Sequence, residues 1–152
     1  MLLFGYLVAL SLPAWANAEV DALLQRDEAP HGVVFEIVES DDEALEVLLP
    51  RLQVAIASLR ERFPQIEFAV VSHGREEFAL QQSYQDDYPE IHRQVQSLVA
   101  QDVPVHVCET HAGWYGVSAQ DFPDYVNVAP TGPGQIELYQ ELGYDLVVIE
   151  LD

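Results

Sequence analysis

The sequence contains no lysine, and its 152 residues include only six basic side chains, all of them arginines. With 26 acidic residues the formal net charge is −20, and no arginine follows Arg93. Nucleic acids and anionic membrane surfaces are therefore not expected partners, because both are bound through clusters of Lys and Arg. Chemistry on a lysine Schiff base is excluded as well. The acidic surplus favours a well-solvated surface, and adaptation to high salt is the alternative interpretation.

Cysteine is almost absent too, since Cys108 is the only one, and glycine-rich phosphate loops, GxSxG and paired-carboxylate signatures are missing. Cys108 follows the apolar run 103–107, with His106 two residues before it and His111 three residues after it. Side chains two apart in a strand point to the same face, so we expect His106 and Cys108 to share one. A neighbouring histidine is a normal partner for a nucleophilic thiol. The alternative is that Cys108 is a small buried apolar residue.

Charged side chains are missing from residues 1–18, which contain the apolar run Leu2–Leu12. This run has the length of the hydrophobic part of a secretory signal peptide and is too short to span a bilayer. Small residues at 16 and 18 provide a cleavage site before Glu19. We therefore predict a signal peptide over 1–18, a mature chain exported to the periplasm, and no stable membrane insertion after cleavage. The alternative is a buried first strand or helix. Residues 19–32 are predicted to form an exposed N-terminal arm.

Apolar strands alternate with helices from residue 33 to residue 152, and we predict that this segment is one domain. The strands are continuous apolar runs, as burial on both faces requires, whereas the helices repeat apolar residues every three or four positions. The expected strands cover 33–38, 66–71, 103–107, 125–128 and 144–151, and the main expected helices cover 40–62, 90–102 and 135–142. This order predicts an α/β fold, a three-layer α/β/α sandwich with a mostly parallel five-stranded sheet.

Polar residues follow several of these strands, and the carboxyl ends of parallel strands share one edge of a sheet. Cys108, His73 and the loops at Ser40 and Thr131 are therefore expected along one rim. His73, Cys108 and His111 form a weaker alternative, a nitrogen–sulfur site for zinc or copper, although their spacing matches no known metal pattern. Otherwise the sequence predicts no cofactor.

Four other residues have predicted positions that do not depend on this rim. His31 and His92 are predicted to lie at the surface. Trp114 and Tyr115 are expected either to cap a ligand pocket or to fill a subunit interface.

The segments AVVSHG, VPVHVCETHAGWYG with SAQDF, and VAPTGPGQIELYQELGY follow one another in an order that resembles the DsrE/DsrF-like family. That family includes sulfur-relay subunits such as DsrE and TusD, and the resemblance covers residues 33–151. Its most specific parts are Val107-Cys108 at the strand end and Gln140-x-x-Gly143-Tyr144 near the last strand. The relay subunits are cytosolic and differ after the cysteine, where ETHAGWYG is more similar to the broad, exported branch.

The resemblance implies a three-layer α/β/α sandwich that assembles as a homo-oligomer, a trimer or a hexamer. It implies that Cys108 carries a persulfide, accepting sulfane sulfur from a donor protein and passing it to an acceptor protein. We expect His73, His106 or His111 to tune the ionisation of this thiol, and backbone N–H groups near Glu109 and Thr110 to hold the transferred sulfur. Such group transfer makes the chain a sulfurtransferase-like carrier. The alternatives are a periplasmic binding module for a metal or small ligand, and a structural subunit of an oligomer.

Overall fold

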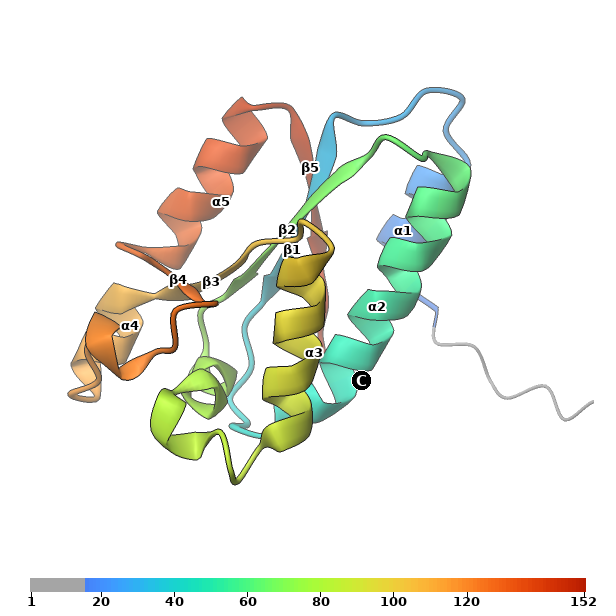
Figure 1. Cartoon of the computed structure of the whole chain (residues 1–152). Helices are drawn as coiled ribbons and strands as arrows, with labels where there is room; N and C mark the ends of the chain where they lie inside the picture. Colours follow the sequence, from blue (N-terminus) through green and yellow to red (C-terminus); the bar gives the residue numbers. More distant parts are fainter. Residues whose placement is uncertain (1–15) are drawn as a thin grey trace, which may run out of the picture.

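The computed structural model describes residues 16–152, which form a five-stranded sheet with helices on both faces (Figure 1). The order across the sheet is β4-β3-β2-β1-β5, and every neighbouring pair is parallel. The predicted α/β fold is confirmed. The strands are β1 (Gly32–Ile37), β2 (Glu67–Ser72), β3 (Val105–Cys108), β4 (Asn127–Ala129) and β5 (Tyr144–Val148).

The helices form two layers around this sheet, and short helices lie at its carboxyl edge. Helices α1 (Ala18–Leu24), α2 (Ala44–Arg62) and α3 (Pro89–Ala100) cover one face, and α5 (Gly132–Glu141) covers the other (Figure 1). The 3-10 turns η1 (Arg75–Leu80) and η2 (Gln82–Tyr84) lead from β2 to α3, whereas α4 (Glu109–Trp114) and η3 (Ala119–Asp121) lead from β3 to β4. None of the helices within residues 16–152 is both long and apolar enough to cross a membrane.

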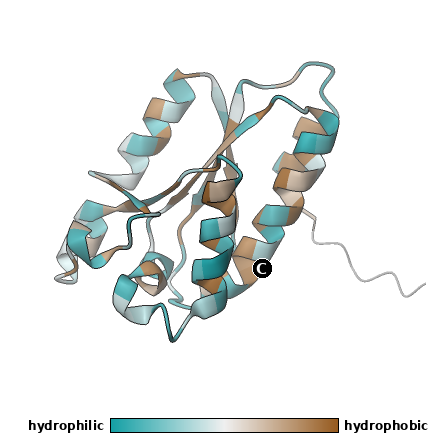
Figure 2. Cartoon of the chain, in the orientation of Figure 1, coloured by the Kyte–Doolittle hydropathy of each residue, from teal (hydrophilic) through white to brown (hydrophobic). Residues whose placement is uncertain are grey.

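The two faces of the sheet are packed unequally. The face under α1, α2 and α3 holds the larger core, in which the rings of Phe35 and Phe68 stack with centroids 5.9 Å apart. Leucines of α2 are buried at every third or fourth position, so the segment forms one amphipathic helix that continues through Pro50. Hydrophobic and hydrophilic residues alternate along the helices, as expected for helices with one buried side (Figure 2). The face under α5 has only a small apolar cluster around Val34 and Ile136, which leaves room for polar side chains.

The N-terminal part of the described chain differs from the prediction. Asn17 caps α1 by accepting the N–H of Val20 on its Oδ1 atom, and its Nδ2 atom donates to the carbonyl oxygen of Val148 at 3.1 Å. Val20 and Leu23 are buried against α2 and β5. The exposed arm predicted over 19–32 is therefore wrong for the residues in α1. Residues 1–15, most of the predicted signal peptide, lie outside the described residues.

Candidate functional site

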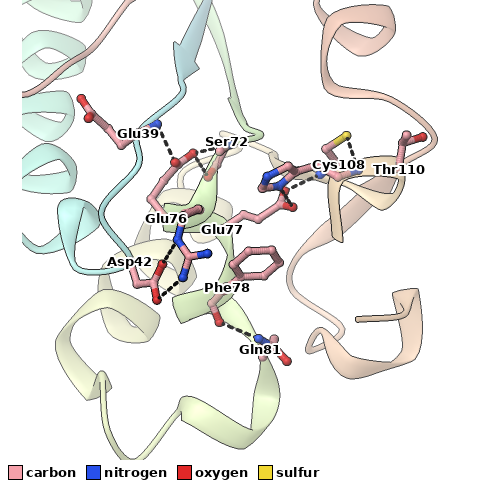
Figure 3. A network of polar contacts seen from close by, with 12 residues as sticks. Glu39, Asp42, Ser72, Glu76, Glu77, Phe78, Gln81, Cys108 and Thr110 are labelled. Atoms are coloured by element: carbon pink, nitrogen blue, oxygen red, sulfur yellow. Dashed lines mark hydrogen bonds and ion pairs between the residues drawn. The ribbon is translucent and has the colours of Figure 1, made fainter. Parts of the chain in front are cut away.

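Cys108 is the last residue of β3 and the N-cap of α4, one residue beyond the predicted strand end. Its backbone N–H donates to Oε2 of Glu77 at 2.8 Å, and its Sγ atom accepts the backbone N–H of His111 at 3.4 Å (Figure 3). Only 4% of the residue is exposed. The strand and the start of the helix thus fix the sulfur, and a backbone donor is directed at it.

Glu77 is hydrogen-bonded to Cys108, and the sequence alone did not indicate this contact. It lies in η1, its side chain is fully buried, and its Oε1 atom is 2.9 Å from Nδ1 of His111. Burial raises the pKa of the Glu77 carboxyl to about 8, although the Cys108 amide lowers it, and the charge of Glu76 adds to the increase. Burial therefore favours the uncharged carboxyl near neutral pH, and its Oε1 atom faces the ring of His111.

Glu76 holds the loops that bring η1 to the sulfur. Its Oε1 atom accepts Ser72 Oγ at 2.8 Å and the N–H of Gly74 at 3.0 Å, and its Oε2 atom accepts the N–H of Glu39 at 2.7 Å (Figure 3). Burial raises the pKa of Glu76 as well, against these donors. A Cβ atom at Gly74 would lie 2.4 Å from the Glu76 carboxylate, so the turn closes on this side chain. Glu76 therefore joins the ends of β1 and β2, and Glu77 follows directly.

The ring of His111 is enclosed by aromatic side chains. It stacks on Phe78 with centroids 5.3 Å apart, and it meets Tyr115 edge-on at 5.3 Å and Trp114 at 5.7 Å. The His111 side chain is 15% exposed, whereas Trp114 and Tyr115 are largely exposed. His111 therefore links the sulfur network to an aromatic surface.

The other two histidines predicted to act on Cys108 bind elsewhere. Nε2 of His73 pairs with Oε1 of Glu36 at 2.7 Å, and Nε2 of His106 is hydrogen-bonded to the hydroxyl of Tyr139 in α5 at 2.8 Å. Burial lowers the pKa of His106. Within residues 16–152, no three His, Cys, Asp or Glu side chains are grouped to hold a metal ion. The alternative metal site of His73, Cys108 and His111 is therefore wrong, because the structure gives each histidine a different partner.

Two further expectations need correction. The N–H of Thr110 donates to the carbonyl oxygen of Pro130 at 3.3 Å, as its hydroxyl does at 2.7 Å, while Glu109 is exposed at the start of α4. The amide that reaches the sulfur belongs to His111 instead. His92, predicted at the surface, is 1% exposed, and its ring is hydrogen-bonded to the carbonyl oxygen of Ala79 and to a tyrosine hydroxyl.

The missed glutamates left one signal in the sequence. Glu76 and Glu77 directly precede the apolar triplet 78–80 and lie four and five residues after Ser72, the last residue of β2. A pair of acids beside an apolar run in a short connection is a candidate for burial, but the partner that buries it, α4, lies some thirty residues further on. Only the folded chain shows that partner.

The parallel sheet and its two helical layers define a DsrE/YchN-like α/β fold. A solved protein of unknown function, MTH1491 from Methanobacterium thermoautotrophicum, is similar with a TM-score of 0.63 and 22% identity over 78% of this chain and 98% of that chain. YchN from E. coli is similar with a TM-score of 0.54 and 23% identity over 77% of this chain and 98% of that chain. No family model and no curated protein sequence matches. The two neighbours therefore establish the fold.

Proposed function

We propose that this chain is a sulfane-sulfur carrier and that the thiol of Cys108 accepts the sulfur. The observation that carries the proposal is the setting of the sulfur, which accepts the His111 amide at a strand end while the Cys108 amide binds the buried Glu77. The DsrE/YchN-like fold supports the proposal, and the resemblance of the sequence to the sulfur-relay family implies a working cysteine at this strand end.

The reaction is a transfer between thiols without any external oxidant. The Cys108 thiolate attacks the outer sulfur of a donor persulfide, R–S–S⁻, forming a new S–S bond as the donor S–S bond breaks. The products are the Cys108 persulfide and the donor thiolate, R–S⁻, so oxidation states and charges balance. An acceptor thiolate then attacks the outer sulfur of Cys108 in the same manner and restores its thiolate.

The Glu77–His111 pair determines which charge faces this sulfur. A bare carboxylate at Glu77 would disfavour a thiolate or a persulfide anion on the adjacent residue. Burial raises the pKa of Glu77 and so favours its uncharged carboxyl, and the contact between its Oε1 atom and Nδ1 of His111 orients the ring. The backbone N–H of His111 donates to the sulfur, and an uncharged Glu77 adds no negative charge beside it.

The test of this proposal is the loading of Cys108 with sulfur. The protein is incubated with glutathione persulfide and its intact mass is measured before and after reduction with dithiothreitol. Wild-type protein should gain one sulfur atom that dithiothreitol removes. The variant Cys108→Ser should gain none, while its circular dichroism spectrum and urea midpoint stay close to those of wild type. Unloaded wild-type protein, or a loaded Cys108→Ser variant, would overturn the proposal.

We also propose that the carrier is exported and assembles from identical subunits, as the apolar N-terminus and the family resemblance imply. Two exposed apolar side chains, Leu138 in α5 and Leu142 directly after it, support a subunit contact on that side of the sheet. Light scattering on protein recovered from a periplasmic fraction tests both points. A trimer or a hexamer that begins near Glu19 is expected, and an uncleaved monomer would contradict them.

A further inference from the structure

A cavity of about 240 Å³ opens beside the sulfur site, between η1, η2 and the chain after α4. Four of its lining residues are aromatic: Phe78, Tyr84, Tyr88 and Tyr115. We call this cavity, with those four rings, the aromatic groove. Tyr84 and Tyr115 are largely exposed, so the groove opens to solvent.

One histidine ring separates the aromatic groove from the sulfur network. Phe78 and Tyr115 contact each other at 5.1 Å between ring centroids, and each lies 5.3 Å from the ring of His111. His111 in turn pairs with Glu77 and donates its amide to Cys108. A molecule bound in the groove would therefore be placed next to the sulfur site without occupying it.

Several carboxylates lie on one side of the groove. A second hollow, lined by residues 40–43 together with Arg75 and Tyr88, adjoins it and shares Asp42 with it. Burial raises the pKa of Tyr88, and the nearby charges of Glu43, Asp42 and Asp87 raise it further. A tyrosine whose pKa is raised by several nearby carboxylates lies in a region of negative electrostatic potential.

The cations of the chain do not compensate this potential. Arg75 is bound by Asp42 through two hydrogen bonds of 3.0 and 3.2 Å, which pairs one positive with one negative charge. Among the described residues, no ion pair involves Asp41, Glu43 or Asp87. The other five arginines have partners elsewhere, namely Asp145 for Arg26, Asp152 for Arg51, Gln101 for Arg60, the Arg26 carbonyl for Arg62 and Glu90 for Arg93.

Arg75 also shows how the groove walls accommodate a guanidinium group. Its Cζ atom lies 5.5 Å from the ring centroid of Tyr115 and 6.0 Å from that of Phe78, while Asp42 binds its nitrogens. Aromatic faces with a nearby carboxylate are the general means of holding organic cations. Tyr84 and Tyr88 present the same chemistry, together with unpaired acids, to a cation from outside.

We propose that the aromatic groove docks a segment rich in arginine or lysine on the protein that exchanges sulfur with Cys108. The identity of this partner as a sulfur donor or acceptor rests on the proposed function. A second copy of this chain does not fit the groove, because it has no lysine and its six arginines form no arginine-rich segment. A basic segment satisfies the carboxylates, stacks on the tyrosines and is steered towards the site by the charge of the whole chain.

The test measures binding of a short peptide with two arginines, and of the same peptide with two glutamates, by isothermal titration at low salt. The variant Glu43→Gln/Asp87→Asn removes two charges at the groove, and Glu137→Gln/Glu141→Gln removes two from the exposed side of α5. We expect the groove variant to weaken binding of the arginine peptide by about fivefold and the α5 variant by less than about twofold. The glutamate peptide should not bind.

A second variant tests the rings without changing any charge. Tyr84→Leu should weaken the arginine peptide by about threefold, as expected for one lost cation–π contact. Equal weakening by the groove and α5 charge variants, or no effect of Tyr84→Leu, would show that the peptide is held only by the net negative charge of the chain. Either result would overturn the docking proposal. Peptide binding is also measured on Cys108→Ser, which cannot be loaded with sulfur. A failure of the docking proposal is therefore distinguishable from a failure of the proposed function.

Discussion

Two histidine–glutamate pairs lie near the carboxyl edge of the sheet, and they have different surroundings. Nε2 of His73 is 2.7 Å from Glu36, whose side chain is 22% exposed, and Nδ1 of His111 is 2.9 Å from Glu77, whose side chain is 0% exposed. Glu36 accepts this one contact, whereas Glu77 also accepts the amide of Cys108. The same two chemical groups are thus placed once beside solvent and once beside a thiol.

The two pairs differ in burial and in a third partner, because Glu77 is buried and also accepts the amide of Cys108. Water screens the charge of a partly exposed carboxylate, so His73 and Glu36 act mainly as a polar contact beneath α5. The Glu77 side chain is shielded from bulk solvent, and burial raises its pKa to about 8. Its proton is therefore exchanged within the pH range in which a thiol also ionises. We infer that only the His111 pair can couple protonation to the chemistry of Cys108.

The first prediction concerns the packing of the His73 pair. A Cβ atom at Gly132 would lie 2.5 Å from both Cβ and Cγ of His73, so Gly132→Ala must displace the ring or the start of α5. We expect a loss of about 2 kcal/mol in the free energy of unfolding, measured with urea. Sulfur loading of the folded variant should equal that of wild type, because His73 does not contact the sulfur network.

The matched control for this change is Gly113→Ala. Gly113 lies inside α4, and nothing within 4 Å would meet its Cβ atom. Alanine there should be neutral or stabilising by up to about 1 kcal/mol, since it is the better helix former. Equal stability of Gly132→Ala and wild type would show that the ring of His73 moves freely, and the proposed packing role would then be wrong.

The sequence predicts a region well when the residues that form it are close together in the chain. The sheet is predictable because its strands are local apolar runs, and the predicted strand 66–71 differs from β2 by one residue at each end. Helix α1 escaped prediction because only Val20 and Leu23 face the core, which is too few for a visible period. Local patterns therefore predict the scaffold but miss elements with few apolar residues.

The site is predictable only in the part that is local in sequence. Cys108 and His111 are three residues apart at a strand end, so their proximity follows from the chain itself. The contact of Glu77 with Cys108 spans 31 residues and depends on how η1 packs under α4. In the sequence Glu77 stands in a polar connection, where an acid is normally solvated. A long-range contact thus decides whether this glutamate is a surface charge or a buried acid.

The second prediction concerns the pH dependence that distinguishes the buried pair. The pKa of Glu77 is raised from 4.5 to about 8, so the folded protein binds a proton that the unfolded chain has released in this range. The contribution is fully present below about pH 4.5, and it is lost as the pH rises towards and through 8. Glu77→Gln keeps a neutral side chain of the same shape at every pH.

Urea unfolding of wild type and Glu77→Gln from pH 5 to pH 9 measures this difference. Relative to the variant, wild type should lose stability by no more than about 1.4 kcal/mol per pH unit up to pH 8, and nothing further above it. Glu36→Gln makes the same change at the other pair and is measured alongside as the matched control. Parallel curves for wild type and Glu77→Gln would contradict the raised pKa.

The smallest expected effect is on the reaction rate of the thiol, and it separates the two histidines directly. His111→Gln retains a polar contact with Glu77 but removes the ring that stacks on Phe78. Alkylation of Cys108 by iodoacetamide at pH 7 should slow by about threefold to fivefold, because the ring contacts that hold the residue-111 amide against the sulfur are lost. The identical change His73→Gln, next to Glu36, should leave the rate within about 1.5-fold of wild type, since no contact joins that pair to the sulfur. Equal slowing in both variants would place the two pairs in one network, and the distinction drawn from burial would fail.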